Sequence, residues 1–351
     1  MNTKRIKIDE VNISIEELEE ASQILKAGGL VAFPTETVYG LGADGLNADA
    51  SGKIYAAKGR PSDNPLILHI ADLEDLKEIA VNIPENGLKL AKAFWPGPLT
   101  LIFEKSEKVP LSTTGGLSTV AVRMPSHKIA QELIKQSGVY IAAPSANVSG
   151  RPSPTTAEHV LDDLDGIIEM VIDGGKVTIG LESTIVDVTA DKPIILRPGY
   201  ITEDMLSQVV GEVEYDKAVL ARSIQNDFIP KAPGMKYRHY SPKGELVIYE
   251  GDTKQVIKSI NQAAEEKILQ GYKVGIIATE ETRSFYLKGT VKTIGTRRDD
   301  NTIARGLFEV LRAFDTEGCE YIFTESFDNN QLGQAIMNRL LKAAGYHIKK
   351  V

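Results

Sequence analysis

Cysteine is almost absent from this sequence, in which Cys319 is the one cysteine among 351 residues. A single thiol excludes an intramolecular disulfide and any multi-cysteine metal site, and the five histidines lack the spacing of zinc ligands. No apolar run approaches the roughly 20 residues that span a bilayer, and the N-terminus lacks the apolar segment of a signal peptide. These absences predict a cytoplasmic protein with no membrane segment and no structural zinc.

Basic residues are in the minority, with 40 Lys and Arg against 48 Asp and Glu and a net charge of −8. This balance argues against a surface built to bind nucleic-acid backbones, although it leaves room for a basic pocket. The composition, 42% hydrophobic and 25% charged, is that of a folded globular protein. At about 150 residues per domain, the length predicts two or three domains.

Short apolar runs alternate with amphipathic segments along most of the chain. The predicted helices cover residues 14–28, 72–80, 85–94, 128–137, 156–164, 254–269, 303–314 and 333–344. The predicted strands cover residues 30–33, 66–70, 99–104, 119–123, 139–143, 170–172, 184–188, 194–197, 246–249, 274–278 and 321–324. This order predicts an α/β fold.

Two domains follow from the spacing of these elements. Residues 1–212 are predicted to form a large α/β domain with a twisted mixed sheet. Residues 244–351 alternate strand and helix and predict a small Rossmann-like domain of three layers. Residues 213–243 lose the periodicity, and a linker of about 30 residues is long enough to suggest a functional loop.

The sequence contains neither a Walker phosphate loop nor the glycine fingerprint of dinucleotide-binding sheets. Two early segments nevertheless combine polar side chains with glycine. Residues 33–42, F-P-T-E-T-V-Y-G-L-G, carry two threonine hydroxyls in a predicted turn where a ligand can approach closely. Residues 58–70 begin with Lys58 and Arg60, whose two charges suit a polyphosphate. Three alternatives remain open. They are a turn whose hydroxyls bond to its own backbone, a basic loop exposed to solvent, and a structural role for His69 in the core.

Further polar side chains occur where predicted strands begin or end. Arg123 is placed to hold a carboxylate through two hydrogen bonds. Other candidates in the segments 142–155, 182–186 and 195–199 are Ser145, Asn147, Ser153, Ser183 and Arg197. Each serine or asparagine taken singly can be an ordinary turn former. Together, and without a carboxylate pair or a Ser-His-Asp order, they predict a site for a polyanion next to a small zwitterion.

These segments resemble the YrdC/Sua5 family of threonylcarbamoyl-AMP synthases. The motifs occur in order over residues 33–199 as P-T-E-T-V-Y-G-L, K-G-R-P-x-D-N-P-L-x-x-H, W-P-G-P-L-T, T-V-A-V-R-M-P, A-P-S-A-N, S-P-T, E-S-T-I-V and L-R-P-G. The later A-P-G-M-K-Y-R-H-Y-S-P and the α/β tail are similar to the long, two-domain Sua5 type. The resemblance implies a YrdC-like catalytic domain over 1–212, an active-site lid over 213–243 and a Sua5-type C-terminal domain over 244–351.

The resemblance implies a nucleotidyltransferase that makes L-threonylcarbamoyladenylate and pyrophosphate from L-threonine, bicarbonate or CO2, and ATP. Mg2+ is expected to accompany ATP, with no metal held by protein residues. The product is expected to supply a downstream transferase that forms t6A at position 37 of tRNA. Direct binding of tRNA is left open.

The site residues are also implied by the resemblance. Lys58 and Arg60 are the implied catalytic residues, which offset charge on the phosphates. The implied threonine pocket contains Thr35, His69, Arg123, Ala143 and Ser183, with Thr37 as a second choice. The implied ATP site contains Lys58, Arg60, Asn64, Thr119, Ser145, Asn147, Ser153, Arg197 and, in the lid, Tyr237.

Two other classes of function compete with this interpretation. An RNA-binding module would use Lys58 and Arg60 on the phosphate backbone without making an adenylate, but the acidic composition disfavours it. A carbamoyltransferase or hydrogenase-maturation module shares the first domain by resemblance. It would need an acylphosphatase segment or cysteine clusters, and one cysteine cannot provide the latter.

Overall fold

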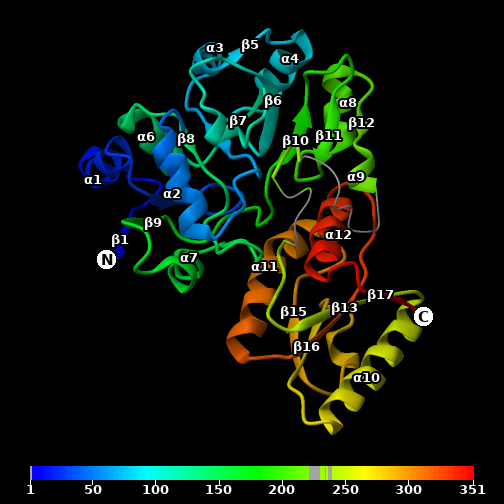
Figure 1. Cartoon of the computed structure of the whole chain (residues 1–351). Coiled ribbons are helices and arrows are strands. Elements are labelled where there is room, and N and C mark those ends of the chain that lie inside the picture. Colours follow the sequence, from blue (N-terminus) through cyan, green and yellow to red (C-terminus); the bar gives the residue numbers. More distant parts are fainter. Residues whose placement is uncertain (1, 221–229, 234, 236–238) are drawn as a thin grey trace.

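The computed structural model describes residues 2–220, 230–233, 235 and 239–351, which fold around two separate sheets (Figure 1). The strands of the large sheet are β1 (Lys4–Lys7), β2 (Val31–Phe33), β3 (Gly40–Asp44), β4 (Ile67–His69), β5 (Ala80–Val81), β6 (Leu99–Lys105), β7 (Thr119–Arg123), β8 (Ile141–Ala142), β9 (Met170–Asp173), β10 (Thr184–Asp187), β11 (Ile194–Arg197) and β12 (Glu214–Tyr215). Its order is β1-β9-β2-β3-β8-β4-β7-β6-β10-β11-β12, with β5 beside β6. Parallel pairs such as β4 and β7 occur beside antiparallel pairs such as β6 and β7, so the predicted mixed sheet is confirmed.

Helices of the large domain pack against this sheet. They are α1 (Ile15–Lys26), α2 (Ala48–Lys58), the 3-10 turn η1 (Leu73–Asp75), α3 (Leu76–Ile79), α4 (Glu85–Phe94), α5 (Leu111–Thr114), α6 (Lys128–Ser137), α7 (Ala157–Leu164), α8 (Glu203–Val210) and α9 (Lys217–Leu220). The predicted start of α1 is confirmed, because Ser14 and Glu17 form a capping box that satisfies its first backbone amides. Helix α6 ends at Gly138, which takes the left-handed conformation that glycine adopts without strain.

The small sheet consists of β13 (Glu245–Glu250), β14 (Val274–Ala278), β15 (Thr290–Thr293), β16 (Tyr321–Glu325) and β17 (Ile348–Lys350). All its pairs are parallel, in the order β15-β14-β16-β13-β17. Its helices are α10 (Thr253–Leu269), the 3-10 turn η2 (Arg283–Phe285), α11 (Asp300–Glu317) and α12 (Leu332–Ala343).

Alternation along β13 explains the three layers of this domain. Val247 and Tyr249 enter the core that contains α10, whereas Leu246 and Ile248 enter the core that contains α11 and α12. A strand with apolar residues on both faces needs a helix layer on each side. The predicted Rossmann-like three-layer arrangement is therefore confirmed.

Helices α11 and α12 lie between the small sheet and the large domain (Figure 1). Leu181 and Val38 of the large domain belong to the same apolar cluster as Phe308 of α11. Arg312 of α11 donates to the carbonyl oxygen of Pro152 and pairs with Asp163 at 2.8 Å. The second domain thus packs directly on loops of the first.

Several elements were not expected from the sequence. Helix α2 was missed because its buried face includes Ser51 and Lys58, so its apolar residues show no helical repeat. Strand β3 lies where the sequence predicts a turn, because it contains Gly40 and Gly42. Strands β1, β5, β12, β15 and β17 are short and partly exposed, and they lack an alternating apolar pattern. The pairing of β12 with β11 adds residues 214–215, at the start of the predicted linker, to the large sheet.

Candidate active site

Strand pairing gathers the polar side chains at one end of the large sheet. His69 and Arg123 are register partners at the ends of the parallel strands β4 and β7. Because β6 runs antiparallel to β7 and parallel to β10, the starts of β6 and β10 lie at that same end. Thr100 of β6 therefore contacts Ser183, which precedes β10, at 2.7 Å. Arg197, at the end of the antiparallel neighbour β11, donates to Ser183 Oγ at 3.1 Å.

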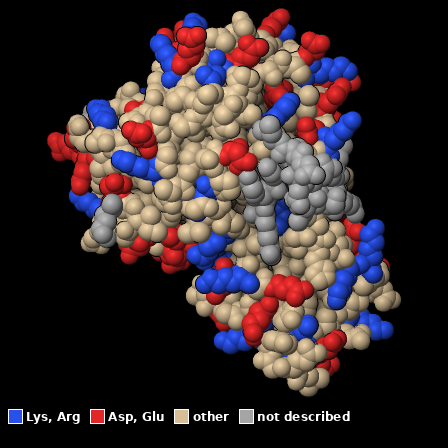
Figure 2. Space-filling model, in the orientation of Figure 1, with Lys and Arg blue, Asp and Glu red and all other residues tan. Residues whose placement is uncertain are grey.

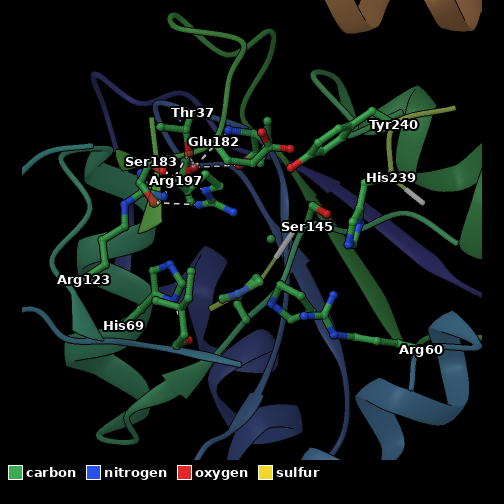
Figure 3. Close-up of a pocket in the computed structure, with 17 residues that line it drawn as sticks. Thr37, Arg60, His69, Arg123, Ser145, Glu182, Ser183, Arg197, His239 and Tyr240 are labelled. Atoms are coloured by element: carbon green, nitrogen blue, oxygen red, sulfur yellow. Dashed lines mark hydrogen bonds between the residues drawn. The ribbon is translucent and has the colours of Figure 1, made fainter. Parts of the chain in front are cut away.

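A cavity opens between these strand ends and the segment before the second domain (Figure 3). Its lining residues are Thr35, Thr37, Val38, Gly40, Arg60, Ile67, His69, Arg123, Ala143, Pro144, Ser145, Glu182, Ser183, Arg197, Pro233, His239 and Tyr240. All five residues implied for threonine binding are among them, as are Arg60, Ser145 and Arg197 of the implied ATP site. Lys58, Asn64, Thr119, Asn147 and Ser153 are not lining residues, and Tyr237 falls outside the described residues.

The threonine hydroxyls of the segment after β2 are buried and linked to Arg123. Thr35 Oγ1 donates to the carbonyl oxygen of Val38 at 2.6 Å and lies 2.9 Å from Thr37 Oγ1. Arg123 Nη1 donates to Thr37 Oγ1 at 2.9 Å. These contacts hold a guanidinium at the cavity wall, where it is placed to receive a carboxylate.

Arg123 also contacts a carboxylate that the sequence interpretation passed over. Its Nη2 lies 2.7 Å from Glu36 Oε1, and both side chains are buried. The approach lacks hydrogen-bond geometry, and neither Glu36 oxygen has a hydrogen-bond donor among the described residues. The contact is therefore an ion pair that offsets part of the Arg123 charge.

His69 has a defined tautomer. Its Nδ1 lies 3.1 Å from the carbonyl oxygen of Ile67 and 3.3 Å from that of Ile141, and since a carbonyl only accepts, Nδ1 carries the proton. Burial, together with the charge of Arg123, lowers the pKa of His69 to about 3. The imidazole is therefore neutral, with Nε2 as a hydrogen-bond acceptor in the cavity.

Two other arginines supply positive charge. Arg197 is buried, and Arg60 is only partly exposed, with its Nε and Nη2 donating to the carbonyl oxygens of Asn64 and Pro65. Among the described residues, neither guanidinium has a carboxylate within ion-pair distance. Burial lowers the pKa of each to about 10, which leaves both charged at neutral pH. Cations held in this way favour an anionic ligand.

Lys58 differs from its predicted setting. It is the last residue of α2 and not part of a turn, and its side chain is buried. Nζ donates to the carbonyl oxygens of Ser145 and Asn147, so it ties the end of the helix to that loop. Burial, with the neighbouring Arg60 charge, lowers its pKa well below the usual range. The described geometry places Lys58 behind the cavity wall that contains Ser145.

The other implied ATP residues surround the cavity at different depths. Asn147 accepts from Ser145 Oγ at 2.5 Å, and Ser153 donates to Glu182, so both support lining residues. Asn64 is buried, and its Oδ1 has no partner among the described residues. Thr119 starts β7, four residues from Arg123, which at roughly 3.3 Å per residue puts it at the far end of the strand.

The described end of the predicted lid lines the cavity. Pro233, His239 and Tyr240 line it, and Figure 3 shows the last two on the side of Ser145 and Arg60. The Tyr240 ring stacks on Phe308 of α11, with ring centroids 5.2 Å apart. The described part of the segment therefore joins the second domain to the cavity.

Three charged residues at or near the cavity, Glu36, Glu182 and Arg339, are not singled out by the sequence motifs. Glu36 and Glu182 stood inside the quoted motifs, but an isolated glutamate carries no signal of burial. Arg339 of α12 pairs with Glu182 Oε2 at 2.7 Å, and no local pattern could have linked residues 157 positions apart. Only the packing of the two domains brings them together.

The described residues contain no group of three His, Cys, Asp or Glu side chains that could hold a metal ion. They also contain no helix with the length and apolar character needed to cross a membrane.

Both domains of the chain match known proteins. The family model described as "Telomere recombination" matches residues 23–199, and the model of "Threonylcarbamoyl-AMP synthase, C-terminal domain" matches residues 201–345. The threonylcarbamoyl-AMP synthases of Pyrococcus abyssi and Bacillus subtilis are 48% and 47% identical to this chain. The alignments cover 99% and 98% of it and 98% and 99% of those proteins.

A solved structure agrees over the whole length. The crystal structure of P. abyssi Sua5 complexed with L-threonine matches with a TM-score of 0.92 and 46% identity, covering all of both chains. The first domain alone also matches Escherichia coli YciO, with a TM-score of 0.51, 26% identity and coverage of 56% of this chain and 95% of that one. Both domains, their order and the fold agree, and the chain belongs to the Sua5 family of threonylcarbamoyl-AMP synthases.

Proposed function

We propose that this chain makes L-threonylcarbamoyladenylate and pyrophosphate from L-threonine, CO2 or bicarbonate, and ATP. The observation that carries the proposal is the cavity itself. It contains Arg60 and Arg197, which have no carboxylate within ion-pair distance among the described residues, together with Thr35, His69 and Arg123. Figure 3 shows Arg60 across the cavity from His69 and Arg123. A triphosphate and an amino acid can therefore be held side by side, as the family membership and the threonine complex of the P. abyssi relative support.

The chemistry needs positioning more than a covalent nucleophile. The neutral amine of threonine attacks CO2, and a carbamate oxygen then displaces pyrophosphate at the α-phosphorus of ATP. Holding the three components in one cavity removes much of the entropic barrier of this sequence. Arg123 is proposed to bind the threonine carboxylate, and His69 Nε2 to accept a hydrogen bond from threonine. Arg60 and Arg197 offset charge on the departing phosphates.

Lys58 has an indirect role in this arrangement. Its Nζ donates to the carbonyl oxygens of Ser145 and Asn147, and Ser145 lines the cavity near Arg60. Asn64, Thr119, Asn147, Ser153 and Tyr237 remain proposed contacts or supports of ATP. The lid, including Tyr240, would exclude water from an adenylate that hydrolyses readily.

Mg2+ is proposed to enter as part of the ATP substrate. The described residues offer no cluster of ligands for a resident ion, and the carboxylate of Glu182 is occupied by Arg339 and Ser153. The phosphate oxygens of the nucleotide are the ligands that suit Mg2+. No step of the proposed mechanism depends on a protein-bound metal.

The product is proposed to supply a transferase that forms t6A at position 37 of tRNA, in the cytoplasm. An RNA-binding module without synthesis is not favoured, because Lys58 is buried and Arg60 lines the cavity. The face in Figure 2 also intersperses acidic and basic side chains and shows no continuous basic tract.

The proposal is tested by incubating the protein with ATP, Mg2+, L-threonine and bicarbonate. Mass spectrometry should detect threonylcarbamoyladenylate together with released pyrophosphate, and omission of any one substrate should abolish the product. Pyrophosphate without the adduct, or no turnover, would contradict the proposal. Steeply salt-dependent binding of tRNA without turnover would revive the RNA-binding alternative.

A further inference from the structure

A side chain of the second domain reaches the wall of the substrate cavity. Arg339 lies on α12 and is completely buried. Its Nε donates to Glu182 Oε2 at 2.7 Å, and its Nη2 donates to the Glu182 carbonyl oxygen at 3.3 Å. Its Nη1 donates to the Pro198 carbonyl oxygen at 2.9 Å. Because Glu182 lines the cavity, this ion pair crosses the domain boundary at the active site.

Glu182 lies beside Ser153 and Arg197, which are assigned to the nucleotide, and next to Ser183, which is assigned to threonine. Its Oε1 accepts from Ser153, and the adjacent Ser183 accepts from Arg197. Glu182 and Arg197 both line the cavity, and the Glu182 charge acts on Arg197. A carboxylate free to turn towards Arg197 would cancel the charge that phosphates need.

Arg339 holds that carboxylate in place. Burial alone would raise the pKa of Glu182, but the charges of Arg339 and Arg197 and the hydrogen bond from Ser153 keep it below its usual value. Glu182 is therefore ionised and needs a cation of its own. Arg339 provides it from behind the cavity wall, since Glu182 is a lining residue and Arg339 is not.

The same guanidinium also supports the lid. Its central carbon lies 5.7 Å from the centre of the Tyr240 ring, on which Phe308 stacks. Figure 3 shows Glu182 and Tyr240 facing the same cavity. One buried side chain thus lies against two residues that line the cavity, Glu182 and Tyr240.

We propose that Arg339 is a positioning residue of the nucleotide site. By pairing with Glu182, it leaves Arg60 and Arg197 available to the triphosphate of ATP. This inference rests on the proposed synthase function and names a contribution of the second domain to it. The second domain then supplies charge balance to the active site as well as support for the lid.

The test compares ATP affinity among variants of the full chain by calorimetry with Mg-ATP. Arg339→Met leaves the Glu182 charge without its partner, and we expect ATP binding about tenfold weaker or more. Adding Glu182→Gln to that variant removes the competing charge and should restore binding to within about threefold of the wild type. Glu182→Gln alone keeps an acceptor for Ser153 and should bind ATP at least as tightly as the wild type.

Gln334→Ala is the matched control. Gln334 lies on the same helix and accepts a hydrogen bond from Tyr215 of the large domain at 2.5 Å, away from the cavity. Its loss should leave ATP affinity unchanged, which separates the effect of Arg339 from a general loosening of the interface.

Each outcome decides the inference. Wild-type ATP affinity in Arg339→Met would overturn the inference. A double variant that binds ATP as weakly as Arg339→Met would also overturn it, because it would show that Arg339 has a merely structural role. If Arg339→Met does not fold, the ATP affinity of Glu182→Gln alone decides, and binding tenfold weaker than that of the wild type overturns the proposal. An active wild type combined with an unaffected Arg339→Met overturns this inference only, whereas a wild type without turnover overturns the synthase function and this inference with it.

Discussion

Glu36 and Arg123 form a buried ion pair in which Oε1 and Nη2 are 2.7 Å apart, directly beside the proposed threonine site. Glu36→Gln leaves the guanidinium without a charge partner in a buried position. We expect the free energy of unfolding to fall by about 3 kcal/mol, because an uncompensated buried charge is costly. Chemical denaturation measures this change.

The control for this ion pair is Glu10→Gln, since Glu10 is half exposed and lies 3.8 Å from His127. It should change stability by less than about 0.5 kcal/mol. Equal effects of the two substitutions would contradict the importance given to the buried pair. Saturating L-threonine should stabilise Glu36→Gln more than the wild type, because its carboxylate then offsets Arg123.

The neutral state of His69 predicts loss of stability in acid. Its pKa is lowered by burial from 6.5 to about 3, so below pH 6.5 the unfolded chain binds a proton that the folded chain rejects. Stability is then lost as pH falls from about 6.5 to about 3, by at most about 1.4 kcal/mol per pH unit from this residue. Denaturation midpoints across this range should therefore fall more steeply for the wild type than for His69→Gln. Parallel curves would show that His69 is not the group responsible.

Arg60→Ala is expected to weaken the binding of ATP and to leave the binding of threonine unchanged. Loss of a charged hydrogen-bonding group should raise the KM for ATP about tenfold or more and remove most adenylate formation, while threonine binding measured without ATP stays near the wild-type value. Arg298→Ala, which removes an exposed arginine of the second domain, serves as the control. Near-wild-type turnover in Arg60→Ala would contradict the assignment of Arg60 to the ATP site.

Lys58→Ala is expected to lose most adenylate formation in a chain that remains folded. The reason is positional, because two carbonyl groups of the Ser145 loop lose their shared donor. Product formation measured by mass spectrometry, together with circular dichroism, checks both parts. A variant that folds and turns over normally would show that this contact is dispensable.

If the predicted lid excludes water, its loss should expose the adenylate product to hydrolysis. Tyr240→Ala removes the ring that stacks on Phe308, so we expect less adduct and more free AMP, whereas Tyr240→Phe should retain the stack and most activity. Deletion of residues 232–242 should impair synthesis even if the first domain stays folded. The ratio of AMP to adduct over time measures both effects, and equal ratios in all three variants would refute a protective lid.

The agreement between predicted and observed elements shows which parts of the fold are set by local sequence. Helices α4 and α6 and strands β7 and β11 occupy the predicted residues, because apolar periodicity and, for α6, the glycine stop at Gly138 act over a few neighbouring positions. Helix α2 and strand β3 were missed, because their buried faces contain Ser51, Lys58 and glycines that only tertiary contacts cover. Local sequence signals fail where burial depends on distant partners.

The sequence by itself determined the fold class, the two-domain order and the motifs that bring Thr35, Arg60, His69, Arg123, Ser183 and Arg197 into one site. Tertiary structure alone decided which charges are paired. Glu36 meets Arg123, Lys58 turns to the Ser145 loop, and Glu182 receives Arg339 from a helix 157 residues away. The physical reason is that ion pairing depends on distance and burial in space, and neither is encoded in a short stretch of chain.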